Sequence, residues 1–299
     1  MIVKNAELAD SPWWGEDLDG SRLILAIDSS SRIGSLAVVR GHSIVAEASW
    51  TAHGPGGSLH LDLAARLLAD HELKLSHLQG IVVATGPGSF TGIRAGISVG
   101  QGLAEALSIP LVGVPTLHGI VAQVSGLARP GDLVCAIVGA GRGTIHAWTV
   151  VLEQTGESTR FVSCGEFVTT SVEDVALALA ILRQATGRRV VIGGELDSGQ
   201  ARICAAAVPR ASILSPVETQ RRAAWLVGLA RPSLHAMWSD VATPDFSSGL
   251  RTVSHPEDVQ PIYSTSASEG RPTDLGWRVP VHTEIPVDHF AAEAAAEAT

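Results

Sequence analysis

The sequence predicts an α/β protein built from two successive α/β segments, and three observations carry this prediction. The first is a series of three apolar, β-rich stretches at 23–28, 34–40 and 43–50, with a Gly41-His42 turn typical of a hairpin between the last two. The second is a regular alternation of strand-like and helix-like patterns up to about residue 128. The third is a similar alternation between residues 132 and 230.

The first segment is predicted to run β-β-β-α-β-α-β-α. After the three antiparallel strands, Ser58 is a suitable N-cap for a helix over 59–72. The remaining elements of this segment are a strand at 80–86, a helix over about 89–107, a strand at 109–114 and a helix at 115–128.

The second segment begins with a predicted hairpin, 132–140 and 144–153, and a further strand at 159–168. A serine-capped helix at 171–186, a strand at 188–194 and a last helix at 218–230 follow. We therefore expect four regions: a polar N-terminal extension (1–20), a first subdomain (21–115), a second subdomain (116–231) and a low-order C-terminal tail (232–299). Because the tail is rich in Pro, Ser and Gly, we expect the core to fold without it.

Composition limits the classes of function. Hydrophobic residues make up 45% of the 299 positions, as in a globular protein, and the formal net charge is −9. Lys4 and Lys74 are the only lysines, so the chain is a poor candidate for gripping nucleic acid alone, and its charge would mainly aid solubility. Three scattered cysteines and the absence of a signal-peptide or membrane-spanning pattern predict a protein of the reducing cytoplasm.

A glycine-rich loop, "GPGSFTGIR" at 86–94, lies between a predicted strand and a predicted helix, as phosphate-binding loops do. It lacks the second glycine and the lysine of a Walker A loop, so that interpretation fails. The free amides at the start of the helix could still bind an anion. The residues of this loop motif are Gly86, Pro87, Gly88, Ser89, Phe90, Thr91 and Arg94.

Asp28 and Ser29 end the first predicted strand. In the actin and sugar-kinase fold, an aspartate at this point faces a nucleotide phosphate and its magnesium ion, which makes these residues a vestigial phosphate site by analogy. The alternative is a turn-forming aspartate followed by capping serines. A second glycine-rich stretch, "GAGRGT" at 139–144, precedes a strand-like pattern and is read as a hairpin turn, since a dinucleotide site needs a helix there.

Two of the predicted helices carry patterns that suit helix–helix contact. The helix over 59–72 has one apolar stripe at Leu59, Leu63 and Leu67 and a second at Leu61, Ala64, Ala65 and Leu68. Gly92, Gly96 and Gly100 recur every four residues in the next helix, where each costs about 1 kcal/mol relative to alanine. The helices could meet a second molecule, or they could lie deep inside their own domain.

The sequence shows no catalytic constellation. Its histidines lack the spacing of three or four that places two metal ligands on one helix face, and it has no Gly-x-Ser-x-Gly nucleophile elbow.

Three stretches, "ILAIDSSSRIGSLAVV", "HLDLAARLL" and "VVATGPGSFTGIRAGISVGQGLAEALSIPLVGVPTL", resemble the TsaB (YeaZ) family. The resemblance runs from about residue 23 to 230, with a faint echo at "VQPIY", and the 86–94 motif is highly specific. It implies an α/β fold of two actin-like (ASKHA, ribonuclease H-like) subdomains, with mixed sheets flanked by helices.

The resemblance also implies a function. Members of this family look like non-catalytic subunits that bind and support TsaD as it transfers threonylcarbamoyl to adenosine 37 of tRNA (the t6A modification), and a TsaE-like ATPase belongs to the wider complex. The first two helices would pair with those of TsaD, or with a second copy when the protein is alone. The resemblance implies no cofactor of its own, ATP or ADP at the complex junction, contact with tRNA only through the complex, and no membrane.

TsaD carries a His-x-x-x-His metal pair in its third helix, and the corresponding residues here are Thr116 and Ile120, so no bound metal is expected. Two family features are missing: Gly139 stands where an acidic residue is usual, and "YSTS" replaces a Tyr-x-Arg motif. Two alternatives stay open. One is a nucleotide-hydrolysing or peptidase-like enzyme of the same fold, and the other is a self-associating regulatory protein.

Overall fold

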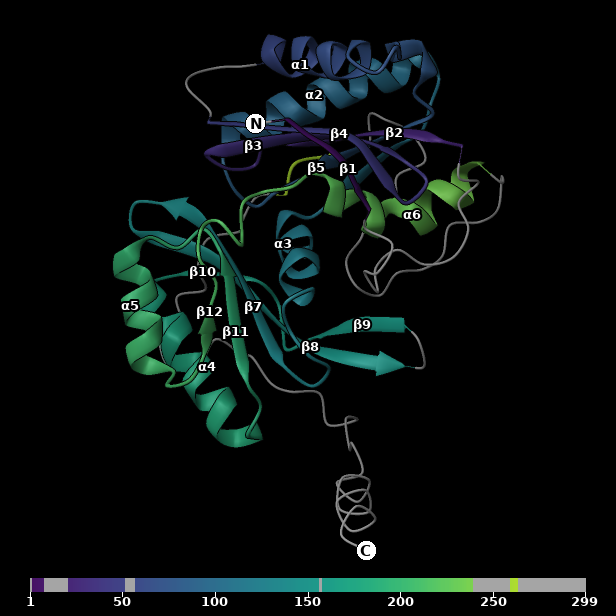
Figure 1. The fold of residues 1–299 in the computed structure, drawn as a ribbon. Coiled ribbons are helices and arrows are strands. Elements are labelled where there is room, and N and C mark those ends of the chain that lie inside the picture. Colours follow the sequence, from purple (N-terminus) through teal and green to yellow (C-terminus); the bar gives the residue numbers. More distant parts are fainter. Residues whose placement is uncertain (1, 8–20, 52–56, 156–157, 239–258, 263–299) are drawn as a thin grey trace, which may run out of the picture.

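The computed structural model describes residues 2–7, 21–51, 57–155, 158–238 and 259–262. Two mixed β-sheets follow one another along the chain, and helices cover both (Figure 1). This confirms the predicted α/β class with two actin-like halves.

The first sheet has the strand order β1-β4-β3-β2-β5-β6. Strands β2, β3 and β4 form the predicted antiparallel series, whereas β5 and β6 run parallel to β2. The bounds are β1 Ile2–Glu7, β2 Leu23–Asp28, β3 Ile33–Arg40, β4 Ser43–Thr51, β5 Gly80–Ala84 and β6 Leu111–Val114.

Helices cover both faces of this sheet. On one face lie α1 (Gly57–Ala69) and α2 (Phe90–Leu107), with a short 3-10 turn at Leu75–His77 after α1. On the other face α6 (Ala224–Trp238) packs against β2, β3, β5 and β6 and contacts α3 (Thr116–Ser125). The central strands are accordingly buried on both faces and read as near-continuous apolar runs.

The second sheet has the order β10-β8-β7-β11-β12, with β9 paired to β8. Helices α4 and α5 cover one face and α3 covers the other, toward the first sheet. The bounds are β7 Leu133–Gly141, β8 Thr144–Thr155, β9 Ser158–Ser163, β10 Val168–Thr170, α4 Val172–Thr186, β11 Val190–Gly194, α5 Ser198–Ala207 and β12 Ser212–Ile213.

Several parts of the chain differ from the sequence-based expectation. Helix α1 begins at Gly57, so Ser58 lies inside the helix and is not its N-cap. Residues 2–7, expected in a polar extension, form β1 and pair with β4, because backbone pairing at a sheet edge needs no apolar pattern. Helix α5 was not predicted; its alanine-rich sequence has a weak apolar periodicity, although Asp197 gives it a capping box. The predicted helix 218–230 is displaced: α6 starts at Ala224 and continues past Pro232.

The predicted low-order tail also contributes to the core. Leu234 of α6 is fully buried under the first sheet, beyond the expected boundary at 231. Val259 is buried against β6 and α2, and the Ile262 amide donates a hydrogen bond to the Thr85 carbonyl at 2.7 Å. The "VQPIY" echo therefore marks a docked segment at 259–262, while residues 239–258 and 263–299 of the tail lie outside the described residues.

Within the residues that the structure describes, no helix is both long enough and apolar enough to cross a bilayer.

Candidate functional site

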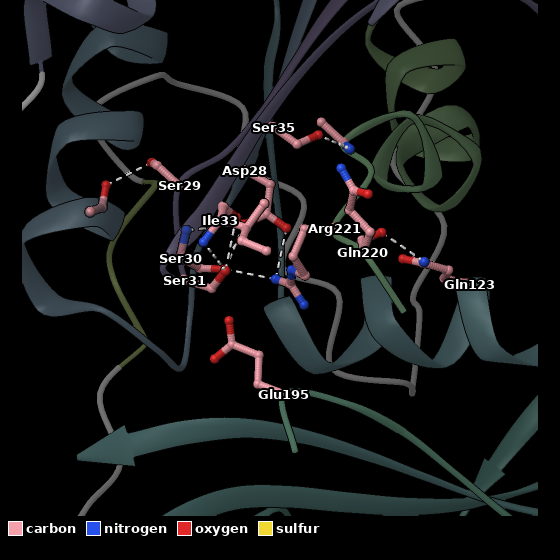
Figure 2. Close-up of polar contacts among 12 residues, drawn as sticks. Asp28, Ser29, Ser30, Ser31, Ile33, Ser35, Gln123, Glu195, Gln220 and Arg221 are labelled. Carbon is pink, nitrogen blue, oxygen red and sulfur yellow. Dashed lines mark hydrogen bonds and ion pairs between the residues drawn. The ribbon is translucent and has the colours of Figure 1, made fainter. Parts of the chain in front are cut away.

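The turn after β2 is where the actin-like fold would hold a nucleotide phosphate. Both oxygens of the buried Asp28 carboxylate have partners in this structure. Oδ1 accepts hydrogen bonds from the Ser30 amide at 3.0 Å and from the Ser30 hydroxyl at 2.5 Å. Oδ2 forms an ion pair with the Arg221 guanidinium at 2.7 Å (Figure 2). The contacts of Oδ1 thus fit the turn-forming interpretation of Asp28, whereas Oδ2 binds Arg221.

Arg221 enters this site from a distant part of the chain. Its side chain is only 4% exposed, and Nη2 also donates to the Ser30 hydroxyl at 2.7 Å. A cation therefore lies where a magnesium-bound phosphate would have to approach, and it neutralises the carboxylate. This contact was not predicted, because Arg221 was expected to lie on a helix. The local signal in the sequence is a pair of adjacent arginines before an apolar run.

The neighbours of Arg221 bind the first sheet as well. The Gln220 side-chain amide donates to the Ser49 hydroxyl at 2.7 Å, and Arg222 pairs with Glu47 at 2.9 Å. Burial raises the pKa of the Glu47 carboxyl above its usual range, against the opposing effect of Arg222. The Ala223 amide donates to the Ser35 hydroxyl of β3 at 2.6 Å, so the 219–223 segment, between β12 and α6, is bound to β2, β3 and β4.

The glycine-rich loop rests on the same turn. The Ser89 amide donates to the Ser30 carbonyl at 2.7 Å, and Ser89 caps α2 by accepting from the Gly92 amide at 3.3 Å. Gly88 has a φ of +150° and lies so close to the Ser30 carbonyl that a Cβ atom there would collide with it. Two of the amides that could have bound an anion therefore have partners within the chain.

Across the junction, Glu195 follows the carboxyl end of β11. Its carboxylate accepts a hydrogen bond from the Gly139 amide at 3.2 Å, and Figure 2 shows it pointing toward the Asp28 turn. A Cβ atom on Gly139 would lie 3.6 Å from Glu195 Oε2, so this carboxylate lies beside the position where the resemblance implies an acidic residue. No sequence pattern pointed to this residue.

The glycine row on α2 faces the chain's own first subdomain, which corrects the expectation of a partner helix. A Cβ atom on Gly92 would collide with the Ser29 carbonyl, and one on Gly96 would lie 2.5 Å from the Ser29 hydroxyl. A Cβ atom on Gly100 would lie 2.6 Å from a methyl group of Val83. The glycine periodicity alone could not distinguish close approach to a partner helix from close approach to other parts of the same chain.

The leucine stripe on α1 is also mostly internal. Leu67 is buried, Leu63 is partly buried in the same core, and the side chain of Leu59 lies outside the described residues. The outer surface instead exposes Leu61, which is 40% exposed, and Phe90 at the start of α2, which is 53% exposed. The Arg94 guanidinium stacks 4.0 Å from the centre of the Phe90 ring.

A pocket of about 370 Å³ lies beside this outer surface. Residues of α2 and of the docked 259–262 segment form its walls, and the Gln101 side-chain amide donates to the Val259 carbonyl at 3.2 Å between them. The lining consists of Arg94, Ile97, Ser98, Gln101, Val259, Gln260 and Pro261.

The two positions that correspond to the metal pair of TsaD are buried. Thr116 and Ile120 lie on α3 inside the protein. Among the residues described by the structure, no three His, Cys, Asp or Glu side chains gather where they could hold a metal ion. Burial raises the pKa of both the Cys135 and Cys164 thiols to about 12, so the thiolate form that binds metal is disfavoured there.

Comparisons with known proteins show which families this chain resembles. The family described as "TsaD: tRNA N6-adenosine threonylcarbamoyltransferase" matches residues 59–176. The tRNA threonylcarbamoyladenosine biosynthesis protein TsaB of Bacillus subtilis is 33% identical over 124 residues, which are 41% of this chain and 52% of that protein. TsaB of Buchnera aphidicola is 31% identical over 144 residues, which are 46% of this chain and 67% of that protein.

The alignment spans about half the length of the Bacillus relative. Among solved structures, YeaZ from Pseudomonas aeruginosa superposes with a TM-score of 0.58 at 22% identity, covering 81% of this chain and 100% of that chain. At this identity the superposition establishes a shared fold.

Proposed function

Because this chain belongs to the TsaB (YeaZ) family, we propose that it takes part in the biosynthesis of threonylcarbamoyladenosine in tRNA. In this proposal it is a cytoplasmic, non-catalytic subunit that binds a TsaD-type protein, and the transfer reaction takes place on that partner.

The observation that carries the non-catalytic role is the ion pair between Arg221 and Asp28. An actin-like enzyme uses this aspartate position to handle the magnesium and phosphate of a nucleotide, and in this chain a buried guanidinium occupies it. Displacing Arg221 would leave a buried unpaired cation, which costs several kcal/mol. We therefore propose that this chain holds no nucleotide at Asp28. The family resemblance implies ATP or ADP at the junction of the two subunits and a TsaE-like ATPase in the wider complex.

The partner surface is assigned to the outer faces of α1 and α2. Leu61 and Phe90 expose large apolar side chains there, and exposed apolar patches often mark protein interfaces. This assignment replaces the glycine row, which lies inside the chain.

The test compares variants in binding to the TsaD of the same cell by calorimetry. Leu61→Asp and Phe90→Asp each place a charge in the proposed interface, so we expect at least tenfold weaker binding. Ile181→Asp is the matched control, because Ile181 is 50% exposed on α4, away from this surface.

Three results would contradict the proposal. Equal TsaD binding by all three variants would remove the interface assignment. If the chain self-associates through Leu61 and Phe90 and does not bind TsaD, it is the self-associating regulator instead. ATP hydrolysis by the purified chain alone, lost in an Asp28→Asn variant, would favour the enzyme alternative.

A further inference from the structure

Arginines gather at one edge of the second sheet, far from one another in sequence. Because β7, β11 and β12 are parallel, the turns that enter them meet at the same edge. The carboxyl end of β11 leads to Glu195 at the subdomain junction, so this amino edge is at the opposite end of the sheet (Figure 1). Entering turns and the last turn of α4 supply Arg129, Arg183, Arg188, Arg189 and Arg210.

Hydrogen bonds hold three of these turns together. The buried Asp132 carboxylate accepts from the Arg129 amide at 2.7 Å and from Arg189 Nε and Nη2 at 3.0 and 2.7 Å. Arg188 Nη1 donates to the Gly131 carbonyl at 2.7 Å. Arg189 Nη1 also lies 3.4 Å from the Ser212 hydroxyl, two residues after Arg210. Asp132 and Arg189 therefore form the structural support of the edge.

The remaining arginines give the edge an excess of positive charge. The ion pairs described there are Arg189–Asp132 and Arg160–Glu153, each of which is neutral as a pair. Within the described residues, neither Arg129 nor Arg210 takes part in an ion pair, and both are exposed. The chain has a net charge of −9, so a cluster of positive side chains at one edge stands out from the rest of the molecule and suits an anionic partner.

We propose that this arginine edge, formed by Arg129, Arg183, Arg188 and Arg210, contacts the phosphate backbone of RNA. Guanidinium groups bind phosphate through paired hydrogen bonds and stay charged at every physiological pH. The turns that enter β7 and β12 are two strand spacings apart, about 10 Å, so the edge can reach more than one phosphate. The identity of the RNA as tRNA rests on the proposed function, whereas the phosphate chemistry does not.

The experiment measures binding of fluorescently labelled tRNA by anisotropy at several salt concentrations. It uses the full chain alone and the full chain with its TsaD. The test variant is Arg129→Gln with Arg210→Gln, because neither side chain takes part in the support of the edge. The control is Arg40→Gln with Arg202→Gln, which removes the same charge at exposed positions elsewhere. TsaD binding is measured separately for each variant.

We expect the test variant to weaken tRNA binding about uniformly across RNA sequences and to lower the slope of log K against log salt by about 2, roughly one for each lost phosphate contact. The control should match the wild type, and TsaD binding should be unchanged in both. An unchanged affinity and salt slope in the test variant would overturn the proposal. Binding to polyglutamate is measured in the same way. If the test variant loses as much affinity for polyglutamate as for tRNA, the proposal is overturned, since the edge would then bind an acidic protein. If the wild-type chain does not bind TsaD, this result counts against the proposed function and not against the RNA contact.

Discussion

Charged and apolar side chains are arranged in opposite ways at the junction between the subdomains and on the outer surfaces of the molecule. At the junction, Arg221 is buried and paired with Asp28, and Arg222 is paired with Glu47. At the far edge of the second sheet, Arg129 and Arg210 are exposed without a described ion pair. The same contrast holds on α2, where the inner side is glycine packed on backbone and the outer side presents Phe90.

This difference distinguishes the chain from enzymes with an actin-like fold. Actin-like enzymes bind ligands between their two halves, where polar groups must stay available. In this chain the Asp28 and Glu47 carboxylates are paired with Arg221 and Arg222, and these ion pairs link the 219–223 segment to the first sheet. Among the described residues, the outer surface instead presents exposed arginines such as Arg129 and Arg210 and exposed apolar side chains such as Leu61 and Phe90.

The largest expected effect comes from removing the chain that returns to the first subdomain. A chain ending at residue 231 loses the fully buried Leu234 and Val259, which together should cost about 3–6 kcal/mol of unfolding free energy. A chain ending at residue 262 keeps both residues and should be close to wild type. Urea denaturation of the two truncations makes the comparison. Equal stability would restore the expectation that everything after 231 is dispensable.

The second effect tests the junction itself. Arg221→Ala leaves the Asp28 carboxylate buried and unpaired, so we expect a loss of about 3–5 kcal/mol. Arg160→Ala is the control: the Arg160 side chain is 66% exposed in its pair with Glu153, and a pair that solvent reaches should cost about 1 kcal/mol or less. Combining Asp28→Asn with Arg221→Met removes both charges and should recover much of the loss. Similar values for the two single variants would mean that the junction is no drier than the surface.

The smallest effect contrasts the two sides of α2. Gly96→Leu should destabilise the protein by about 1–3 kcal/mol, because the new side chain overpacks the Ser29 turn. Gly102→Ala should stabilise it by about 1 kcal/mol, since Gly102 is exposed, a Cβ atom added there would meet no other atom within 4 Å, and alanine favours helix. Thermal melts followed by circular dichroism report both signs. If Gly96→Leu melts like the wild type and only partner binding fails, the glycine row belongs to an interface after all.

Much of the fold was predictable from local patterns. The hairpin between β3 and β4, the serine cap of α4 and the glycine-rich turn before α2 all follow from residues within a few positions of one another. The elements that were missed have weak local signals: β1 depends on pairing with β4, and β12 is two residues long.

The candidate site was only half predictable. Asp28 could be found because it ends a strand, but Arg221 lies 193 positions further along the chain and Glu195 follows a different strand. The direction of the glycine row was equally hidden, because a periodic row tells which residues share a helix face and not what lies opposite that face.

The sequence by itself therefore determined the α/β class, the order of most elements and the family-specific loop at 86–94. Periodicity, capping and turn chemistry are local properties, and they act before distant segments meet. Only the tertiary structure decided that Arg221 neutralises Asp28, that residues 259–262 return to the core, and that Arg129 and Arg210 share one edge. These outcomes depend on parallel strand pairing and on burial between distant segments, where the free energy of a charge is set by its neighbours in space.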